Sequence, residues 1–396
     1  MEKKLRILMM IHRQADNSPY CFYVHEQAKA LTARGHEVVV ISCVGTMPLM
    51  KRLRPKQAEV AARTPCHAVI DGIEVHFPRC LTLGNAGEKY LGGRLLAHAA
   101  LPLAKKLHRE KPFDIVHAHM LPRDGHAGLL VARALGVPFA LTVHGTDIFH
   151  YFIPGKEPWP RNRMIAREAD ALMAVSSLLM SRVAPYRGEG KLSRIVPNGV
   201  DLSLVPQETT NVPRTVISVG TLKARKCMDR TLEAFARLAG EYPDATLTIV
   251  GIGEMEAQLK ARIAELGLEE RVTMTGGLPH EEVIVRMAQS DLFVLPSWGE
   301  GYGIVYIEAM AAGCIAVGAK GEGIEDTIVD GENGFLVPAG DIDETERVMR
   351  SVFQNREAYA ELRAKGRGDA HALTWARNAE TVESVYLEAI RCRMGD

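Results

Sequence analysis

The sequence predicts an α/β protein made of two doubly wound parallel-sheet domains that face a cleft. Short apolar runs of strand length alternate with segments of helix length along the whole 396-residue chain, a pattern typical of parallel sheets. This length is typical of two domains, each able to bury its own core. Turn-forming residues cluster near position 200, where we place the domain boundary. Ligands are expected at the carboxyl ends of the strands.

The first domain is expected over residues 1–200. Its strands are predicted at Leu5–Ile11, Glu37–Ser42, Ile115–His117, Phe139–Val143, Ala171–Val175 and Arg194–Val196. Its helices are predicted at Phe22–Arg34, Leu91–Glu110, Gly125–Leu135 and Pro160–Glu168. Gly35 follows the first helix where a C-cap belongs. The basic run Lys51–Lys56 is predicted to be a loop, either solvated or in contact with lipid headgroups.

The second domain is expected over residues 201–375, followed by an amphipathic terminal helix in residues 376–396. Strands are predicted at Thr215–Gly220, Leu247–Gly251, Val272–Thr275, Leu292–Leu295 and Ile315–Val317. A helix is predicted at Met228–Ala239, and Asp341-Ile342-Asp343 is predicted to begin another.

Composition indicates an ordinary globular protein, with 24% charged and 47% hydrophobic residues. No apolar run reaches the ~18 residues that a membrane-spanning helix needs. The first residues are interpreted as a strand rather than a signal peptide. The seven cysteines lack metal-type spacing, so reduced thiols and a cytoplasmic location are expected.

Charge is distributed unevenly although the net charge is zero. Residues 1–200 hold 28 Lys and Arg against 16 Asp and Glu, whereas residues 201–396 hold 20 against 32. Two interpretations stay open: attraction of the basic half to an anionic membrane surface or phosphate-bearing acceptor, or attraction between the two halves. No nucleic-acid partner is expected.

The most informative segment runs from Glu300 to Gly313. A glycine-bearing loop follows an apolar strand and opens a helix, where backbone N–H groups and the helix dipole attract anions. Glu300 and Glu308 bracket the loop with seven residues between them. Amides for phosphate and carboxylates for hydroxyl groups suit a sugar nucleotide. The alternative is a tight strand–helix turn with two solvated acids.

This spacing, and the order of the motifs along nearly the whole chain, resembles retaining glycosyltransferases of the GT-B fold, family 4, also known as group 1. The resemblance implies two Rossmann-like domains and a terminal helix that crosses back to the first. It implies that Glu300 faces the hydroxyl groups of the transferred sugar and that Glu308, in the first helical turn, binds the ribose. Backbone amides toward sugar and phosphate are then expected from Gly301, Tyr302, Gly303 and Ile304.

A basic turn, Gly220–Lys226, follows the first strand of the second domain. The resemblance assigns Lys226 to the diphosphate, but the family arginine is replaced by Thr221 and the family glycine by Cys227. Lys223 or Arg225 is expected to substitute for that arginine, and a solvated basic turn is the alternative. Two glycine turns, at Gly253 and before Leu278, resemble segments that lie beside the nucleotide.

In the first domain, the strand Leu141–Val143 ends at His144, which the resemblance assigns to the sugar ring or its hydroxyl groups. Asp147 is expected either to orient that imidazole, to contact the acceptor or to cap the following turn. His119 is assigned to the acceptor. His117 and His119 are expected on opposite faces of their strand, which disfavours a shared metal. The first loop lacks the glycine pair of many relatives, so Ser18 and Tyr20 are expected to line the acceptor edge.

No Asp-x-Asp motif follows a strand where it would hold a metal–diphosphate, so neither a metal nor another cofactor is expected. The leaving group would be stabilised by Lys226, its cationic neighbours and a helix dipole. The resemblance implies a nucleotide-diphosphate sugar donor, a carbohydrate or lipid-linked acceptor, and retention through front-face attack. It suggests a role in bacterial cell-surface polysaccharide or glycolipid assembly. Two alternatives stay open: a hexosamine-nucleotide 2-epimerase, and a non-catalytic sugar-nucleotide-binding or scaffold protein.

Overall fold

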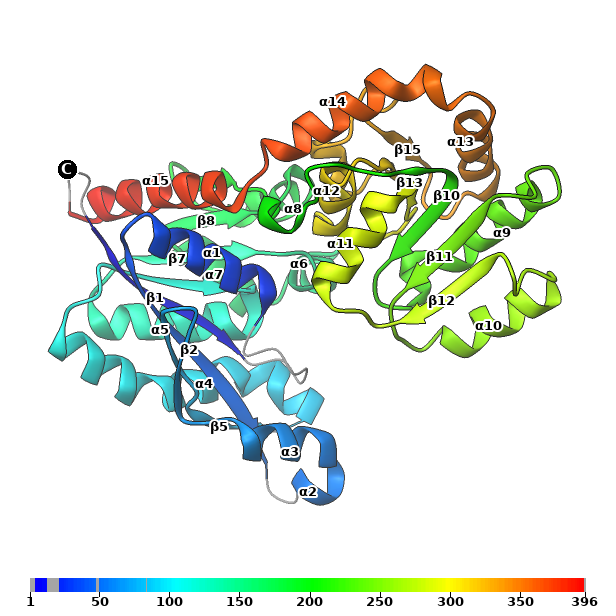
Figure 1. Ribbon diagram of the computed structural model, residues 1–396. Coiled ribbons are helices and arrows are strands. Elements are labelled where there is room, and N and C mark those ends of the chain that lie inside the picture. The colour runs from blue at the N-terminus through cyan, green and yellow to red at the C-terminus, as the bar shows by residue number, and fades with distance from the viewer. Residues whose placement is uncertain (1–3, 13–20, 48–49, 83, 395–396) are drawn as a thin grey trace. The chain divides into compact units, whose positions relative to one another are not determined.

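The structure, a computed structural model, describes residues 4–12, 21–47, 50–82 and 84–394 (Figure 1). The chain forms two compact units. Unit 1 comprises Met1–Pro197 and Trp375–Asp396, and unit 2 comprises Asn198–Thr374. Each unit is built on a largely parallel sheet accompanied by helices, which confirms the predicted fold class.

The sheet of unit 1 has the strand order β3-β4-β2-β1-β6-β7-β8-β9, with β5 also pairing with β2. Only β3 and β4 pair in antiparallel orientation; the other pairs among the described strands are parallel. The strands are β1 (Arg6–His12), β2 (Glu37–Thr46), β3 (His67–Ile70), β4 (Ile73–His76), β5 (Arg79–Leu81), β6 (Ile115–His119), β7 (Phe139–Val143), β8 (Ala171–Ala174) and β9 (Leu192–Ile195). The three strands β6, β7 and β8 are buried along their whole length, which explains why their residues are mostly apolar, although β6 also buries His117 and His119.

The helices of unit 1 come from both the N-terminal part and the C-terminal part of the chain. They are α1 (Phe22–Ala33), α2 (Met50–Leu53), α3 (Pro55–Arg63), α4 (Gly84–Glu110), α5 (His126–Leu135), α6 (Thr146–Tyr151), α7 (Pro160–Glu168), α8 (Ser177–Val183) and α15 (Trp375–Met394). Helix α15, red in Figure 1, packs beside α1, in blue. The Gln27 side-chain amide donates to Asn378 Oδ1 at 2.9 Å, and Tyr386 on α15 contacts His117 of β6. The terminal segment is therefore part of the core of unit 1.

Unit 2 has an entirely parallel sheet with the order β12-β11-β10-β13-β14-β15. The strands are β10 (Val212–Val219), β11 (Thr246–Val250), β12 (Val272–Gly276), β13 (Ser290–Val294), β14 (Ile315–Ala319) and β15 (Phe335–Val337). The helices are α9 (Met228–Ala239), α10 (Glu256–Glu265), α11 (His280–Gln289), α12 (Ile304–Ala311), α13 (Ile342–Gln354) and α14 (Ala360–His371). Asp341 caps α13 by accepting the Glu344 N–H at 3.0 Å, so the predicted helix start is confirmed.

The strand order of unit 2 reverses between β10 and β13. Going outward from β10, the sheet is wound first toward β12 and then, from β13, toward β15. At such a reversal the loops that follow the two central strands diverge and leave a site for ligands. In unit 1 the same reversal falls between β1 and β6.

Two expectations about local structure are wrong. The basic run Lys51–Lys56 is not a loop: it contributes to α2 and, from Pro55, to α3. Proline at the first position of a helix lacks only an N–H that would have no partner there, so it favours this start. The second wrong expectation concerns Glu308, which was placed in the first helical turn. It is the fifth residue of α12 and therefore lies beyond that turn.

The segments that the structure describes contain no helix long and apolar enough to cross a membrane.

Candidate functional site

The loops after β10 and β13 meet at the strand-order reversal of unit 2. The loop after β10 carries Arg225 and Lys226, and the loop after β13 carries Glu300. The Trp298 N–H donates to the Arg225 carbonyl at 2.9 Å, which ties the two loops together through their backbones. Residues separated by more than seventy positions in the sequence thus become neighbours because their strands are adjacent.

Lys226 and Glu300 form an ion pair between these loops. The side chains are only 9% and 14% exposed, so the Lys226 ammonium donates to Glu300 in a largely dry environment. Arg225 adds a second cation, with Nη1 3.9 Å from the same carboxylate and 3.3 Å from the Gly299 carbonyl. Two neighbouring cations, Arg225 and Lys226, are groups that bind phosphate.

Glu322 holds the start of the Glu300 loop, a contact that sequence reasoning missed. Its Oε1 accepts the Gly299 N–H at 2.9 Å, and its Oε2 accepts the Glu300 N–H at 2.7 Å. The Gly323 N–H in turn donates to the Glu300 carbonyl at 3.0 Å. Glu322 therefore fixes the backbone from which the Glu300 side chain projects.

The remainder of the loop leads into α12 through Gly303. Its φ of +82° is left-handed, and a Cβ there would lie 2.5 Å from the Tyr306 ring, so glycine is required. Gly301 and Tyr302 are buried, and Ile304 is the first residue of the helix. One turn further on, Glu308 is 7% exposed and its Oε1 lies 2.8 Å from His280 Nε2. His280 was not singled out from the sequence.

The other donor-side residues differ in exposure and in packing. Lys223 is exposed, and Leu278 is half-buried just before α11. Gly253 packs so tightly that a Cβ would lie 2.4 Å from the Leu222 carbonyl oxygen. Cys227, in the place of the family glycine, adopts a left-handed conformation with φ +52° immediately before α9.

In unit 1, His144 follows β7 and stacks with His119, the last residue of β6. His144 Nε2 lies 3.0 Å from His119 Nδ1, and the Tyr23 ring lies 4.1 Å from the His144 ring between centroids. Among the described residues, His144 Nδ1 and His119 Nε2 are buried without a hydrogen-bond partner. Such atoms are the donors or acceptors that a bound polar molecule could satisfy.

Burial keeps this histidine group neutral. Desolvation lowers the pKa of His144 well below its usual value, and His119 lowers it further. Desolvation likewise lowers the pKa of His119, to about 3, and the pKa of His117 well below its usual value. His144 therefore acts at neutral pH as a hydrogen-bonding group without charge.

Two histidines lie on the same face of β6, contrary to expectation. The rings of His117 and His119 are 4.1 Å apart between centroids, because residues two positions apart in a strand project to the same side. His117 is nevertheless fully engaged: its ring nitrogens lie 2.7 Å from the Tyr386 hydroxyl and 2.8 Å from Thr142 Oγ1.

Asp147 binds backbone groups. Its Oδ1 accepts the His144 and Gly145 N–H groups at 3.1 and 2.9 Å, and its Oδ2 accepts the Leu121 N–H at 3.0 Å. The pKa of Asp147 is raised above its usual value, because burial outweighs the opposing effect of these backbone donors. The Asp147 carboxylate therefore binds the backbone of the loop that carries His144, and these hydrogen bonds do not involve the His144 imidazole.

A further pair, missed by sequence reasoning, lies at the strand-order reversal of unit 1. His12 Nδ1, at the end of β1, lies 2.6 Å from Oδ2 of Asp124, which is fully buried. The predicted acceptor residues Ser18 and Tyr20 lie outside the described residues.

Two family models together match most of the chain. The model for Glycosyltransferase Family 4 matches residues 22–204, and the model for Glycosyl transferases group 1 matches residues 206–369. Glycogen synthase from Mycobacterium tuberculosis is 27% identical over 390 residues, which cover 93% of this chain and 91% of that protein.

Solved structures share the fold. Sucrose-phosphate synthase from Thermosynechococcus elongatus matches with a TM-score of 0.77 at 19% identity, covering 98% of this chain and 100% of that chain. HepE from Anabaena, in complex with UDP-glucose, matches with a TM-score of 0.69 at 18% identity, covering 96% of this chain and 100% of that chain.

The neutral histidines predict that acid destabilises the protein. An unfolded histidine takes up a proton below pH ~6.5, whereas His117, His119 and His144 stay neutral in the folded state. The unfolded state then binds more protons, so the free energy of unfolding falls as pH decreases from 6.5, by up to about 1.4 kcal/mol per pH unit for each histidine.

Urea unfolding between pH 7 and pH 5 measures this slope. His119→Gln is expected to reduce the slope by about one proton, whereas the exposed His98→Gln is expected to leave it unchanged. An equal slope for wild type and His119→Gln would contradict the assignment, whatever the absolute stability of the variant.

Proposed function

The chain belongs to the group 1 glycosyltransferases of the GT-B fold, and we propose that it transfers a sugar, with retention and without a metal, from a nucleotide-diphosphate donor to an acceptor hydroxyl. The observation that carries this proposal is the Lys226–Glu300 pair, with Arg225 beside it, at the strand-order reversal of unit 2. The complex of HepE with UDP-glucose supports a nucleotide-sugar donor for this fold.

On the donor side, Lys226, Arg225 and the more exposed Lys223 bind the diphosphate. Their charges stabilise the leaving group where it develops negative charge, with the N-terminal end of α12 adding its dipole. Glu300 accepts hydrogen bonds from hydroxyl groups of the transferred sugar. Glu308 is held by His280 at 2.8 Å and accepts from the ribose diol.

The chemistry is a front-face substitution. The bond from the sugar anomeric carbon to the diphosphate oxygen breaks, and the acceptor oxygen forms its bond on the same face. The acceptor proton passes to the departing phosphate, so no enzyme base is required. His144, neutral and with Nδ1 buried without a partner among the described residues, hydrogen-bonds a hydroxyl group of the transferred sugar.

The acceptor is a carbohydrate or lipid-linked sugar used in cell-surface polysaccharide or glycolipid assembly, reached at the inner face of the cell membrane. The exposed side chains of α2 and the start of α3 support a membrane contact. Lys51, Arg52, Arg54 and Lys56 are exposed around Leu53, which is itself 60% exposed. A basic surface with an apolar centre suits an anionic bilayer.

Donor binding is tested first, by thermal shift with UDP-, GDP-, ADP- and TDP-sugars. A donor that binds only the native state raises the melting temperature. We expect one nucleotide to do so, with the shift lost in Glu308→Gln and kept in Glu281→Gln, an exposed acid on α11. No shift with any donor would favour a protein that does not use nucleotide sugars.

Turnover tests the cationic group. Lys226→Met is expected to lower kcat/KM by about 10²–10³-fold, because the leaving group loses its main cation. The variant leaves the buried Glu300 carboxylate without the Lys226 ammonium, so circular dichroism and melting temperature of Lys226→Met are compared with those of the wild type to show that lost activity does not reflect misfolding. Lys260→Met on α10 serves as the control.

The same assay follows the stereochemistry and metal dependence of the wild type. Retention of the donor's anomeric configuration, read by NMR of the product, and a rate unchanged by added Mg²⁺ or Mn²⁺ are expected. An inverted product would exclude the front-face mechanism.

Membrane binding is measured by flotation with neutral and anionic liposomes. Each basic residue near an anionic surface contributes about 1 kcal/mol, so replacing Lys51, Arg52, Arg54 and Lys56 by Gln should weaken binding by about 100-fold or more. Lys105→Gln with Lys106→Gln on α4 provides a control. Equal flotation with neutral and anionic lipid would contradict the proposal.

A further inference from the structure

The hairpin β3–β4 forms the edge of the unit 1 sheet. Its two-residue turn consists of Asp71 and Gly72, both with positive φ (49° and 78°), the geometry that matches the twist of paired strands. Asp71 also contacts α1, because its carboxylate lies 2.7 Å from His25 Nε2. The turn end of the hairpin is therefore fixed in place.

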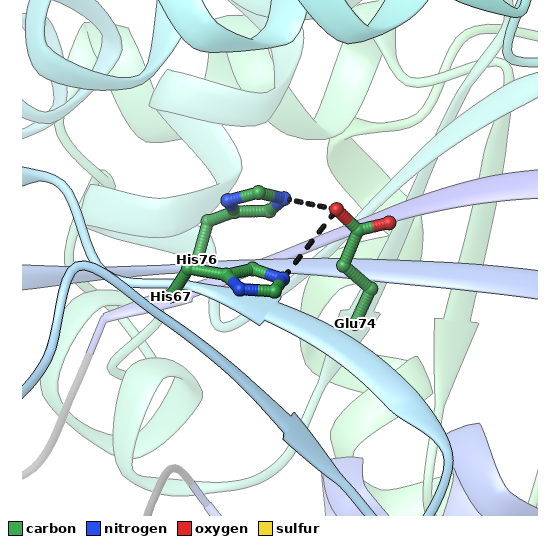
Figure 2. A group of neighbouring side chains, drawn as sticks. All are labelled: His67, Glu74 and His76. Atoms are coloured by element: carbon green, nitrogen blue, oxygen red, sulfur yellow. Dashed lines mark hydrogen bonds and ion pairs between the residues drawn. The ribbon is translucent and has the colours of Figure 1, made fainter.

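Three side chains of types that bind metals lie close together away from the turn: His67, Glu74 and His76. His67 pairs directly with His76 across the two strands, and Glu74 lies two residues before His76 and so on the same face. Figure 2 shows both imidazoles directed at one carboxylate oxygen of Glu74. The Nε2 atoms of His76 and His67 lie 2.8 and 3.6 Å from that oxygen.

The geometry suits a metal better than it suits hydrogen bonding alone. A single carboxylate oxygen faces two imidazoles whose ring centroids are 4.8 Å apart, and one ligand atom from each residue lies within 4.8 Å of the others. Zn²⁺ takes imidazole nitrogen and carboxylate oxygen at about 2.0–2.2 Å, which places ligand atoms ~3.3 Å apart in a tetrahedron. His67 and Glu74, with side chains 47% and 38% exposed, have the freedom to close that gap.

We propose that His67, Glu74 and His76 form a zinc-binding site that joins β3 to β4. The three residues supply three ligands, and the exposed side leaves a fourth position for water. Three strands separate β4 from β7, the strand that leads to His144, and the cations assigned to the donor diphosphate lie in unit 2, so the proposed zinc site is structural rather than catalytic.

The proposed ion would act as a staple. Strands β3 and β4 have four residues each, and β3 is paired only with β4 among the described strands. With the turn already fixed by His25, an ion at the opposite end would hold both ends of the edge hairpin. A metal that binds only the native state stabilises it by mass action.

The test titrates Zn²⁺ into the full-length, chelator-treated protein by calorimetry, with melting temperature as a second readout. One ion per chain and a raised melting temperature are expected. His67→Ala and His76→Ala should each weaken the affinity by about 100-fold or more, since losing even an outer-shell partner typically costs 10–100-fold. His98→Ala on α4 should leave binding unchanged.

Cys66, exposed and adjacent to His67, is the rival ligand. Cys66→Ser is expected to bind Zn²⁺ as the wild type does, and Co²⁺ bound in place of zinc should show nitrogen and oxygen coordination without a thiolate band. Loss of binding in Cys66→Ser, equal binding in His67→Ala and wild type, or weak non-saturating uptake by the wild type would each overturn the site. Circular dichroism of the unloaded variants confirms that lost binding does not come from unfolding.

Discussion

The reversal of strand order between β10 and β13 is the constraint on which the charged site of unit 2 depends. It places the loops that carry Lys226 and Glu300 side by side, and the ion pair between them is largely shielded from water. Removing one partner of a buried pair typically costs 3–5 kcal/mol, so each side chain requires the other. Glu300 thus holds the Lys226 ammonium in this position without a bound anion. In the proposed function, a bound diphosphate would also pair with the Lys226 ammonium. The Glu300 carboxylate would then be more available to accept hydrogen bonds from hydroxyl groups.

Unit 1 contributes a different kind of chemistry. His119 and His144 are buried against each other, and desolvation prevents either from carrying a charge at neutral pH. Asp147 supports them indirectly, by binding the backbone from which His144 projects. The buried histidines of unit 1 are thus neutral hydrogen-bonding groups, whereas the Lys226–Glu300 pair of unit 2 is charged.

The sequence allowed the layered fold to be predicted because its signals are local. The buried parallel strands have mostly apolar sequences, and α9 has the predicted bounds. The short hairpin β3–β4 was missed because each strand has only four residues and no residue of β3 is buried. The sequence analysis named candidate site residues but not the residues that contact them. Contacts such as Glu322 with the Glu300 N–H, His280 with Glu308 and His12 with Asp124 arise from tertiary adjacency, which periodicity does not encode.

Cys227 shows how a departure from the family pattern can be tolerated. Its left-handed backbone costs a non-glycine residue roughly 1–2 kcal/mol, which favours the glycine that the family resemblance led us to expect there. Glycine, however, gives the unfolded chain more freedom to lose and lacks the thiol side chain of Cys227, a residue that is only 5% exposed. These opposing contributions are of similar size, so an exchange between glycine and cysteine would be almost silent in stability.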